Sequence, residues 1–316
     1  MTRFLITGVN GFVAQYFLEY LEKHNNAAEV LGLDIGPTCV YRSTLPLSYR
    51  QVDLTEGDTI RKILADFRPH YILHLAAISS VAQSWLTPLP TFLNNTNIFL
   101  NLAEAVRELK LPTRILSVGS SEEYGNYSEA DMPLREDHIL HPANPYAVAR
   151  VSQELLSQLY SQQYGLDIVM TRSFNHIGPR QRDVFVVASF VKQLVENSGK
   201  SSHTLKVGNV EIVRDFLDVR DVVDAYYKIL TSGRNGEIYN VCSGKGVRLR
   251  EIIDLIAAQL SLRVVIEVDP ARIRPADNMV IIGDNTKLRE SLGWTPVYSL
   301  ENTLQDMICY WCPTQT

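Results

Sequence analysis

The sequence predicts an α/β fold in which a doubly wound parallel sheet is combined with a smaller, interleaved α/β domain. Three observations support this fold class. Short apolar strands alternate with helical periodicity, a glycine turn separates the first strand from the first helix, and the strands are apolar along most of their length. Such strands are typical of parallel sheets that are covered by helices on both faces.

The expected elements follow one another in a regular order. The first strand is expected over 4–7, and a glycine turn and a helix through Leu21 follow it. Apolar runs predict further strands at 29–34, 71–76, 114–120 and 167–172, and the clearest helical periodicity covers 92–110 and 146–164. A strand at 237–242 is expected to rejoin the main sheet.

The pattern loosens after about residue 173, where loops rich in Gly, Pro and Asn interrupt shorter elements. We therefore expect two interleaved domains. The larger would cover 1–172 plus roughly 216–242, and the smaller 173–215 plus 243–316.

The composition argues against several classes of protein. The chain has 316 residues and a formal net charge of −5, which disfavours a nucleic-acid-binding surface. No apolar run approaches the roughly 18 residues that a membrane span needs, and the N-terminus lacks a signal-peptide pattern, so a cytoplasmic location is expected. Cys309 and Cys312 form one C-x-x-C without a second pair of ligands, so we expect two helix thiols and no metal site.

The turn after the first strand has the pattern of a dinucleotide-binding loop. Gly8 and Gly11 hold the first two positions of G-x-x-G-x-x-G, and Ala14 holds the third. Such a turn lets the backbone approach a pyrophosphate, and the following helix directs its free N–H groups at the phosphates. This predicts a Rossmann-type NAD(P)-binding domain in which the loop contributes Gly8, Asn10, Gly11, Phe12 and Val13.

Acidic residues are placed to contact the adenosine half of the cofactor. Asp34 ends the second strand, where a carboxylate accepts hydrogen bonds from the ribose hydroxyls and repels a 2′-phosphate. NAD(H) is therefore favoured over NADP(H). Asp53, with Leu54 beside it, is a candidate for the adenine pocket, and the alternative for Asp53 is a turn or capping residue.

A hydroxyl, a phenol and a cation are expected to meet at the carboxyl ends of the strands. Ser120 ends the strand over 114–120, and Tyr146 and Arg150 lie four residues apart on one helix face. Reduction of a ketone by hydride needs a proton for the developing alkoxide. We therefore predict that these three residues are catalytic, with simple packing as the alternative for Tyr146.

The chain resembles the extended short-chain dehydrogenase/reductase family over nearly its whole length. The segments that carry the likeness are VGSSEEYG, HPANPYAVAR, TRSFNHIGPRQ, VRDFLDVRDVVDAY, YNVCSG, and DPARIRP followed by GWTP. Several of them resemble the members that act on nucleotide sugars, above all those that reduce a 4-keto-6-deoxy sugar. The resemblance implies that Ser120 and Tyr146 are catalytic, that the cofactor wall includes Leu75, Ala76, Ala77 and Asn95, and that the protein is a homodimer.

One residue departs from the family pattern Y-x-x-x-K. Arg150 stands in the place of the lysine, keeps its charge and is effectively never deprotonated, so a proton relay through a lysine amine would be lost. A cofactor-binding module without turnover therefore remains an alternative.

The resemblance leaves the reaction open at Glu122. An acid at this position handles a sugar proton in 4,6-dehydratases but also occurs in the reductases. Ketone reduction is favoured, with a 4,6-dehydratase or 4-epimerase as the alternative. A nucleoside diphosphate needs cations and N–H donors. The candidate substrate-binding residues are Ser80, Ser121, Glu122, Asn175, Arg180, Lys192, Arg214 and Arg274.

Overall fold

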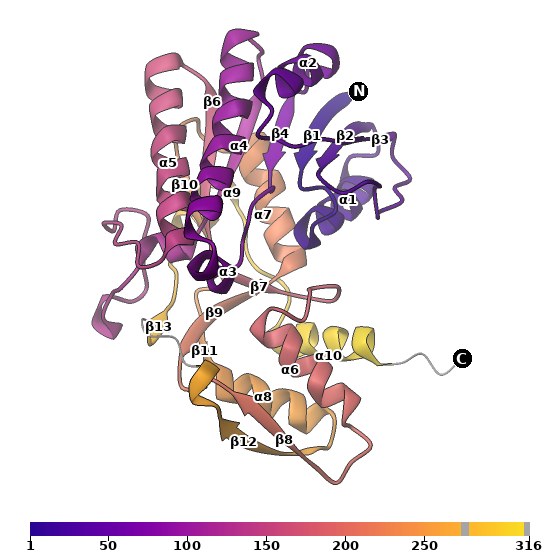
Figure 1. Ribbon diagram of the computed structural model, residues 1–316, viewed down its shortest axis with the longest axis vertical. Coiled ribbons are helices and arrows are strands. Elements are labelled where there is room, and N and C mark those ends of the chain that lie inside the picture. The colour runs from indigo at the N-terminus through magenta and orange to yellow at the C-terminus, as the bar shows by residue number, and fades with distance from the viewer. Residues whose placement is uncertain (273–277, 313–316) are drawn as a thin grey trace.

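A seven-stranded parallel sheet forms the larger lobe of the protein in the computed structural model, which describes residues 1–272 and 278–312 (Figure 1). The strand order is β10-β6-β5-β4-β1-β2-β3. The chain runs outward from β1 through β2 to β3, then returns to β4 and continues in the other direction. The predicted doubly wound sheet is thus confirmed. The strands are β1 (Thr2–Thr7), β2 (Ala28–Asp34), β3 (Leu47–Gln51), β4 (Tyr71–His74), β5 (Arg114–Ser120), β6 (Asp167–Ser173) and β10 (Ile238–Val241).

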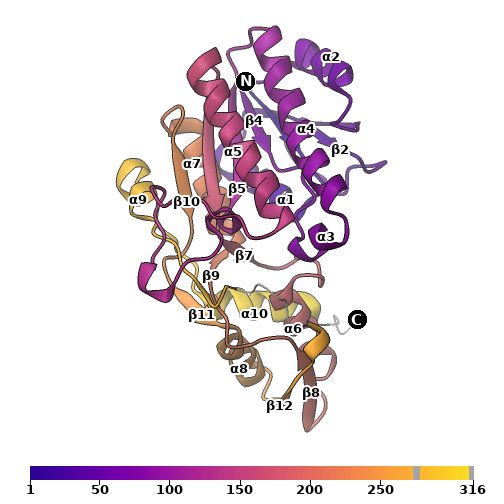
Figure 2. The same ribbon diagram turned by 60° about the vertical axis from the view of Figure 1, so that its left-hand side comes forward.

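Helices cover both faces of this sheet (Figure 2). One face packs against α1 (Phe12–His24) and α7 (Val219–Ser232), and the other against α2 (Gly57–Phe67), α4 (Pro88–Glu108) and α5 (Pro145–Tyr164). Along β1, Phe4 and Ile6 enter the first core cluster and Leu5 enters the second. Because both faces of the strand are buried, its sequence is apolar without alternation.

In the described residues, the smaller lobe contains two short sheets and three helices. A four-stranded sheet contains β7 (Asn175–Ile177), β9 (Val213–Asp218), β11 (Gly246–Arg248) and β13 (Val280–Ile281), and β8 (Ser202–Val207) pairs with β12 (Arg263–Val268). The helices α6 (Val186–Glu196), α8 (Leu249–Gln259) and α10 (Leu300–Trp311) enclose a separate apolar core. Short 3-10 turns lie at η1 (Ser121–Tyr124), η2 (Glu129–Asp131) and η3 (Pro270–Arg272).

The chain passes between the lobes more than once. β10 leaves the smaller lobe and pairs in parallel with β6, which confirms the prediction that 237–242 rejoins the main sheet. The helix α9 (Thr286–Leu292) and the buried Trp294 likewise contribute to the apolar cluster under α1 and α7. The stretch from α9 to Trp294 therefore packs on the larger lobe, whereas the sequence prediction assigns all of 243–316 to the smaller domain.

Among the element boundaries that differ from the sequence prediction, two have clear local reasons. The strand expected over 71–76 ends at His74, because the N–H groups of Leu75 and Ala76 bond to the Thr7 side chain instead of a neighbouring strand. The helix expected from residue 92 begins at Pro88, where the fixed φ of proline suits the first helical position. Within residues 1–272 and 278–312, no helix has the length and apolar character to cross a membrane.

Candidate active site

A cavity of about 1190 Å³ lies where the two lobes meet. The turns that follow β1, β4 and β5 form its floor. The loop between β7 and α6, together with β9, forms the wall that faces this floor. The sheet reverses its direction of winding between β1 and β4, and ligands of open α/β sheets bind at such a reversal, beyond the carboxyl ends of the strands. The volume exceeds that of a typical site for one small ligand, so a dinucleotide and a second ligand can bind together.

Most of the predicted residues line this cavity. The predicted cofactor residues among the lining are Gly8, Asn10, Gly11, Phe12, Val13, Asp34, Asp53, Leu54, Leu75, Ala76, Ala77, Tyr146 and Arg150. The predicted substrate residues among it are Ser80, Glu122, Asn175, Arg180 and Arg214, and Ser120 lies there as well. Arg274 lies outside the described residues.

The glycine turn is shaped for close approach of a phosphate. Gly8 has a φ of +69°, which glycine adopts without strain, and a Cβ on it would come within 3.0 Å of the Ala76 backbone. Gly11 is the N-cap of α1, and among the described residues no side chain caps it and no acid lies in the first turn. The N–H groups at this helix start remain directed toward the cavity for a ligand phosphate.

Asp34 connects the glycine turn to the loop after β2. One carboxylate oxygen accepts from the Asn10 backbone N–H at 3.0 Å, and the other accepts from Gly36 N–H at 3.1 Å. A carboxylate has about four acceptor positions, so Asp34 retains the capacity to bind ribose hydroxyls. Asp53 accepts from the N–H and hydroxyl of Thr55, which lowers the pKa of Asp53 and matches the turn-residue alternative.

The wall after β4 is held by buried side chains behind it. The Asn95 side chain accepts from Ile78 N–H at 2.8 Å and donates to Ile78 C=O at 3.1 Å. Asn95 itself is fully buried and is not among the lining residues, so it supports the wall rather than forming its surface. Thr7 accepts from two backbone N–H groups and lies 2.9 Å from Nδ1 of the buried His74.

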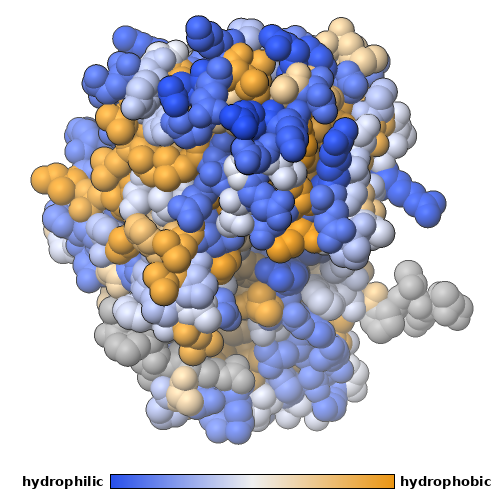
Figure 3. All heavy atoms as spheres, turned by 45° about the horizontal axis from the view of Figure 1, so that its top comes forward, coloured by the Kyte–Doolittle hydropathy of each residue, from blue (hydrophilic) through white to orange (hydrophobic). Residues whose placement is uncertain are grey.

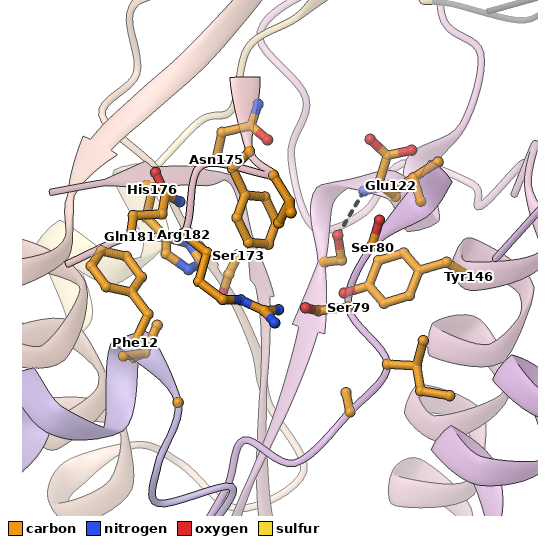
Figure 4. Close-up of a pocket in the computed structure, with 18 of the residues that line it drawn as sticks. Phe12, Ser79, Ser80, Glu122, Tyr146, Ser173, Asn175, His176, Gln181 and Arg182 are labelled. Carbon is orange, nitrogen blue, oxygen red and sulfur yellow. Dashed lines mark hydrogen bonds between the residues drawn. The ribbon is translucent and has the colours of Figure 1, made fainter. Parts of the chain in front are cut away.

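Ser120 is positioned by a 3-10 turn at the end of β5. Its Oγ accepts from Glu122 N–H at 3.2 Å, the bond drawn as a dashed line at Glu122 in Figure 4. Its own N–H donates to the Glu123 carboxyl at 2.6 Å. Glu123 is fully buried, and burial together with the neighbouring Glu154 raises the pKa of Glu123 well above its usual value. Glu123 is therefore a structural acid, whereas Glu122 faces the cavity.

Tyr146 and Arg150 form a buried pair on the first turns of α5. Arg150 Nε donates to the Tyr146 hydroxyl oxygen at 3.1 Å. Arg150 Nη1 donates to Val118 C=O at 3.1 Å and to Gln153 Oε1 at 2.7 Å. Since the guanidinium bonds to the phenol oxygen, the phenolic proton is left to point toward a ligand. The arginine thus occupies the family lysine position and is held there by hydrogen bonds to Tyr146, Val118 and Gln153.

Glu122 and Asn144 form a second polar pair at the cavity. Asn144 Nδ2 donates to Glu122 Oε2 at 2.8 Å, and Asn144 Oδ1 accepts from Ala147 N–H as the N-cap of α5. Figure 4 shows Glu122 above the Tyr146 ring on the side that also carries Ser79 and Ser80. An acid and a phenol therefore approach the cavity from the same side.

The opposite wall carries the residues expected to meet the nucleotide. Asn175 and His176 come from β7 and lie across the cavity from Tyr146 (Figure 4). The His176 ring stacks on Phe12 with 6.2 Å between centroids, and burial lowers the pKa of His176, so it is neutral. Arg214 donates to the carbonyls of Val213 and Asn278 and lines the wall beyond them.

Two predicted substrate residues have other partners, and a third is buried. Arg180 donates to both Glu19 oxygens, at 2.7 and 3.1 Å, and stacks on Tyr16, which favours a role in fixing its loop. Lys192 bonds to Asp183 at 2.6 Å and is not among the lining residues. Ser121 is buried in η1 and is likewise not among them. Their binding roles stay predictions that this arrangement does not favour.

Several lining or supporting residues were not anticipated from the sequence. They are Asn144, Gln153, Ser173, Arg182 and Tyr226. Two had usable signals: an Asn before a proline is a typical helix start, and Gln153 lies three residues after Arg150 on the same helix. Within residues 1–272 and 278–312, no group of three or more His, Cys, Asp or Glu is placed to hold a metal ion. Cys309 lies in α10, Cys312 follows it, and both are exposed.

The fold and this site define the class of the protein: it is a Rossmann-type NAD(P)-dependent oxidoreductase. Residues 5–307 match the family of GDP-mannose 4,6 dehydratase. The chain belongs to this family, which confirms the resemblance seen in the sequence.

Individual relatives agree with this assignment. The chain is 34% identical over 312 residues to GDP-6-deoxy-D-mannose reductase of Pseudomonas aeruginosa, covering 98% of this chain and 97% of the relative. The structure of RMD from Pseudomonas aeruginosa complexed with NADPH is 31% identical, with a TM-score of 0.87 and 99% of both chains covered. The UDP-glucose 4-epimerase of Thermus thermophilus in complex with NAD is 29% identical, with a TM-score of 0.87 over 99% of this chain and 100% of that one.

Proposed function

We propose that the protein reduces the C4 ketone of a nucleotide-linked 4-keto-6-deoxy sugar with NAD(P)H, converting GDP-4-keto-6-deoxy-D-mannose to GDP-6-deoxy-D-mannose (GDP-D-rhamnose). The observation that carries this proposal is the Tyr146 hydroxyl, held by Arg150 at 3.1 Å and directed to a cavity whose floor is the glycine turn. A proton donor beside a dinucleotide site is the arrangement that ketone reduction needs.

The residues of this chain have distinct tasks in that reaction. The bound dinucleotide supplies the hydride. Ser120, at the end of β5, holds the ketone oxygen by a hydrogen bond, because its Oγ accepts from Glu122 N–H and its proton remains available. Tyr146 gives its proton to the same oxygen as negative charge develops there. Arg150 keeps the phenol oriented and stabilises the phenolate that remains.

The smaller lobe is proposed to hold the nucleotide. Arg214 and Asn175 line the wall opposite Tyr146, and Arg274 is proposed there by resemblance. The proposed division assigns 1–172 plus roughly 216–242 to the cofactor and 173–215 plus 243–316 to the nucleotide sugar. The GDP base and the sugar are supported by the 34% identity to GDP-6-deoxy-D-mannose reductase of Pseudomonas aeruginosa.

NAD(H) is proposed as the preferred cofactor. Asp34 lines the cavity at the end of β2, and a fixed carboxylate there repels a 2′-phosphate. The relatives do not decide the preference, because one of the two solved structures contains NADPH and the other contains NAD.

The proposal is tested by following NADH and NADPH absorbance with GDP-, dTDP-, UDP- and CDP-linked 4-keto-6-deoxy sugars. Oxidation of the cofactor should occur only when the keto-sugar is added, and fastest with the GDP sugar. Tight cofactor binding without oxidation for any of these sugars would favour a binding module and contradict the proposal.

One observation favours a second candidate, a 4,6-dehydratase. Glu122 faces the cavity and is held by Asn144, so an acid is available for a sugar proton. Such an enzyme, like a 4-epimerase, regenerates its cofactor in each turnover. Conversion of GDP-mannose without net change in NAD(P)H absorbance would identify it.

A homodimer is proposed from the outer faces of α4 and α5. These faces expose Leu89, Leu93, Val148, Leu155 and Leu159, each at least 42% exposed. Apolar patches gather on the side of the molecule where these helices lie (Figure 3). Contiguous exposed apolar surface is typical of protein interfaces. Sedimentation of the wild type should give a dimer, and Leu155→Glu should give a monomer; a monomeric wild type would contradict this.

A further inference from the structure

In the loop between β7 and α6, Arg182 lies between two cavity-lining residues, Arg180 and Asp183, whose charges are already paired with other side chains. Arg180 has a φ of +69° and its side chain turns toward α1, where Glu19 binds it. Asp183 accepts from Lys192 of α6 at 2.6 Å. The loop is also closed by hydrogen bonds from Gln181 N–H to Gly178 C=O and from Phe185 N–H to Arg182 C=O.

Arg182 lies between these two fastened neighbours. Its side chain crosses the cavity from the β7 side toward the side that carries Ser79 and Tyr146 (Figure 4). Unlike Arg180, it is exposed, and in residues 1–272 and 278–312 its guanidinium makes no hydrogen bond or ion pair. The loop thus presents to the interior of the site a cation that has no partner in the described part of the chain.

The other arginines that line the described part of the cavity are already bonded. Arg150 binds Tyr146, Val118 and Gln153, Arg180 binds Glu19, and Arg214 binds two backbone carbonyls. A guanidinium presents a planar fork of donors that matches a phosphate, and such charge-assisted bonds are strong. Figure 4 shows Arg182 between Phe12, at the start of α1 beside the glycine turn, and Asn175 of β7. The first borders the proposed dinucleotide site and the second the proposed nucleotide-sugar site.

We propose that Arg182 binds a phosphate of a diphosphate group in this cavity. The proposal rests on the proposed function, because that function brings two diphosphates there: that of the dinucleotide and that of the nucleotide sugar. Both offer the same chemistry to the guanidinium, and the experiment below distinguishes them.

The test compares ligand affinities of the wild type, Arg182→Gln and Arg182→Lys by isothermal titration. One arm uses GDP, UDP, dTDP and CDP, and the other uses NADH and NADPH; guanosine and adenosine serve as ligands without phosphate. Arg289→Gln, at an exposed arginine of α9 that does not line the cavity, is the matched control.

We expect Arg182→Gln to lower the affinity for one class of ligand, either the nucleoside diphosphates or the dinucleotides, by about tenfold or more. This is the scale of one charge-assisted hydrogen bond. Weaker nucleoside diphosphate binding identifies the substrate as the source, and weaker dinucleotide binding identifies the cofactor. Arg182→Lys should keep part of the affinity, and nucleoside binding should not change. The affinity for that class of ligand should also depend less on salt concentration, because one contact with a phosphate is lost.

Two results would overturn the proposal. One is an affinity within about twofold of the wild type in both arms, as expected for the Arg289→Gln control. The other is an equal loss in Arg182→Gln and Arg182→Lys together with a lower melting temperature, which would assign a structural role. If the wild type binds no nucleoside diphosphate and no dinucleotide, the proposed function fails as well. If the wild type reduces a keto-sugar while Arg182→Gln binds equally, only this inference fails.

Discussion

Arg150 Nε lies 3.1 Å from the Tyr146 hydroxyl oxygen, and the two residues are one turn apart on α5. The same guanidinium bonds to Val118 and Gln153, so it is fixed on more than one side. The phenol therefore has an oriented cation beside it even though the family lysine is replaced. We expect catalysis that depends on charge and orientation to be retained, and transfer of a proton through this residue to be lost.

Tyr146→Phe tests the assignment of the proton donor. The substitution removes one oxygen and keeps the ring, so we expect kcat for keto-sugar reduction to fall by about 10² to 10⁴, the range for general acid catalysis. The Kd for NADH should change by less than about threefold, because the glycine turn is untouched. Stopped-flow and titration measurements give the two values. Turnover equal to that of the wild type would remove Tyr146 from the mechanism.

Gln153→Leu tests whether catalysis depends on the hydrogen bond that Arg150 donates to Gln153. The variant removes the acceptor of Arg150 Nη1 and the donor to Ser117 Oγ, which lies 2.8 Å away. We expect kcat to fall about tenfold with little change in KM, since an unmade bond to a charged group costs roughly 1–3 kcal/mol. The effect should be smaller in an Arg150→Lys background, which a double-mutant cycle measures. Ser152→Ala on the same helix is the control, and equal effects of Gln153→Leu in both backgrounds would show that the two residues act independently.

Asp34→Asn tests the cofactor preference. The amide has nearly the shape of the carboxylate but neither repels a 2′-phosphate nor accepts charge-assisted bonds from ribose. We expect the ratio of kcat/KM for NADH to that for NADPH to fall by about tenfold, the scale of one such interaction. Steady-state kinetics with both cofactors give this ratio. If wild type and variant show the same ratio, the ribose contact does not occur.

His74 should make the stability of the fold depend on pH. Burial, and then the charge of Arg150, lowers the pKa of His74 to about 3. The unfolded chain binds this proton near pH 6.5, so between the two values the unfolded state holds more protons and stability decreases as the pH falls. We expect a loss of about 2 kcal/mol from this group between pH 7 and pH 5. Urea unfolding of the wild type and of His74→Gln measures it, and the variant should lack this part of the pH dependence. Identical slopes for both proteins would contradict it.

Local patterns in the sequence were sufficient to predict the main sheet and many of the residues that line the candidate site. Buried parallel strands are mostly apolar, and the glycine turn, Asp34, Ser120 and Tyr146 each lie at one end of a predictable element. Their convergence follows from the geometry of parallel strands, whose carboxyl ends share one edge.

Other assignments depended on contacts between residues distant in the chain. Arg180 is separated by 161 positions from Glu19, its ion-pair partner, so the sequence does not distinguish it from Arg182. Glu122 and Glu123 are identical neighbours, and only the 3-10 turn after β5 directs one to the cavity and the other into the core. Such differences depend on side-chain direction and burial, which composition and spacing do not encode.

Asn144 joins two functions in one side chain, because it caps α5 with its oxygen and holds Glu122 with its nitrogen. Exchange of Glu122 to alter the chemistry of this enzyme would therefore disturb the support of the helix that carries Tyr146. Engineering at this site is better begun with both residues varied together, so that libraries select a new acid and a compatible helix start as one unit.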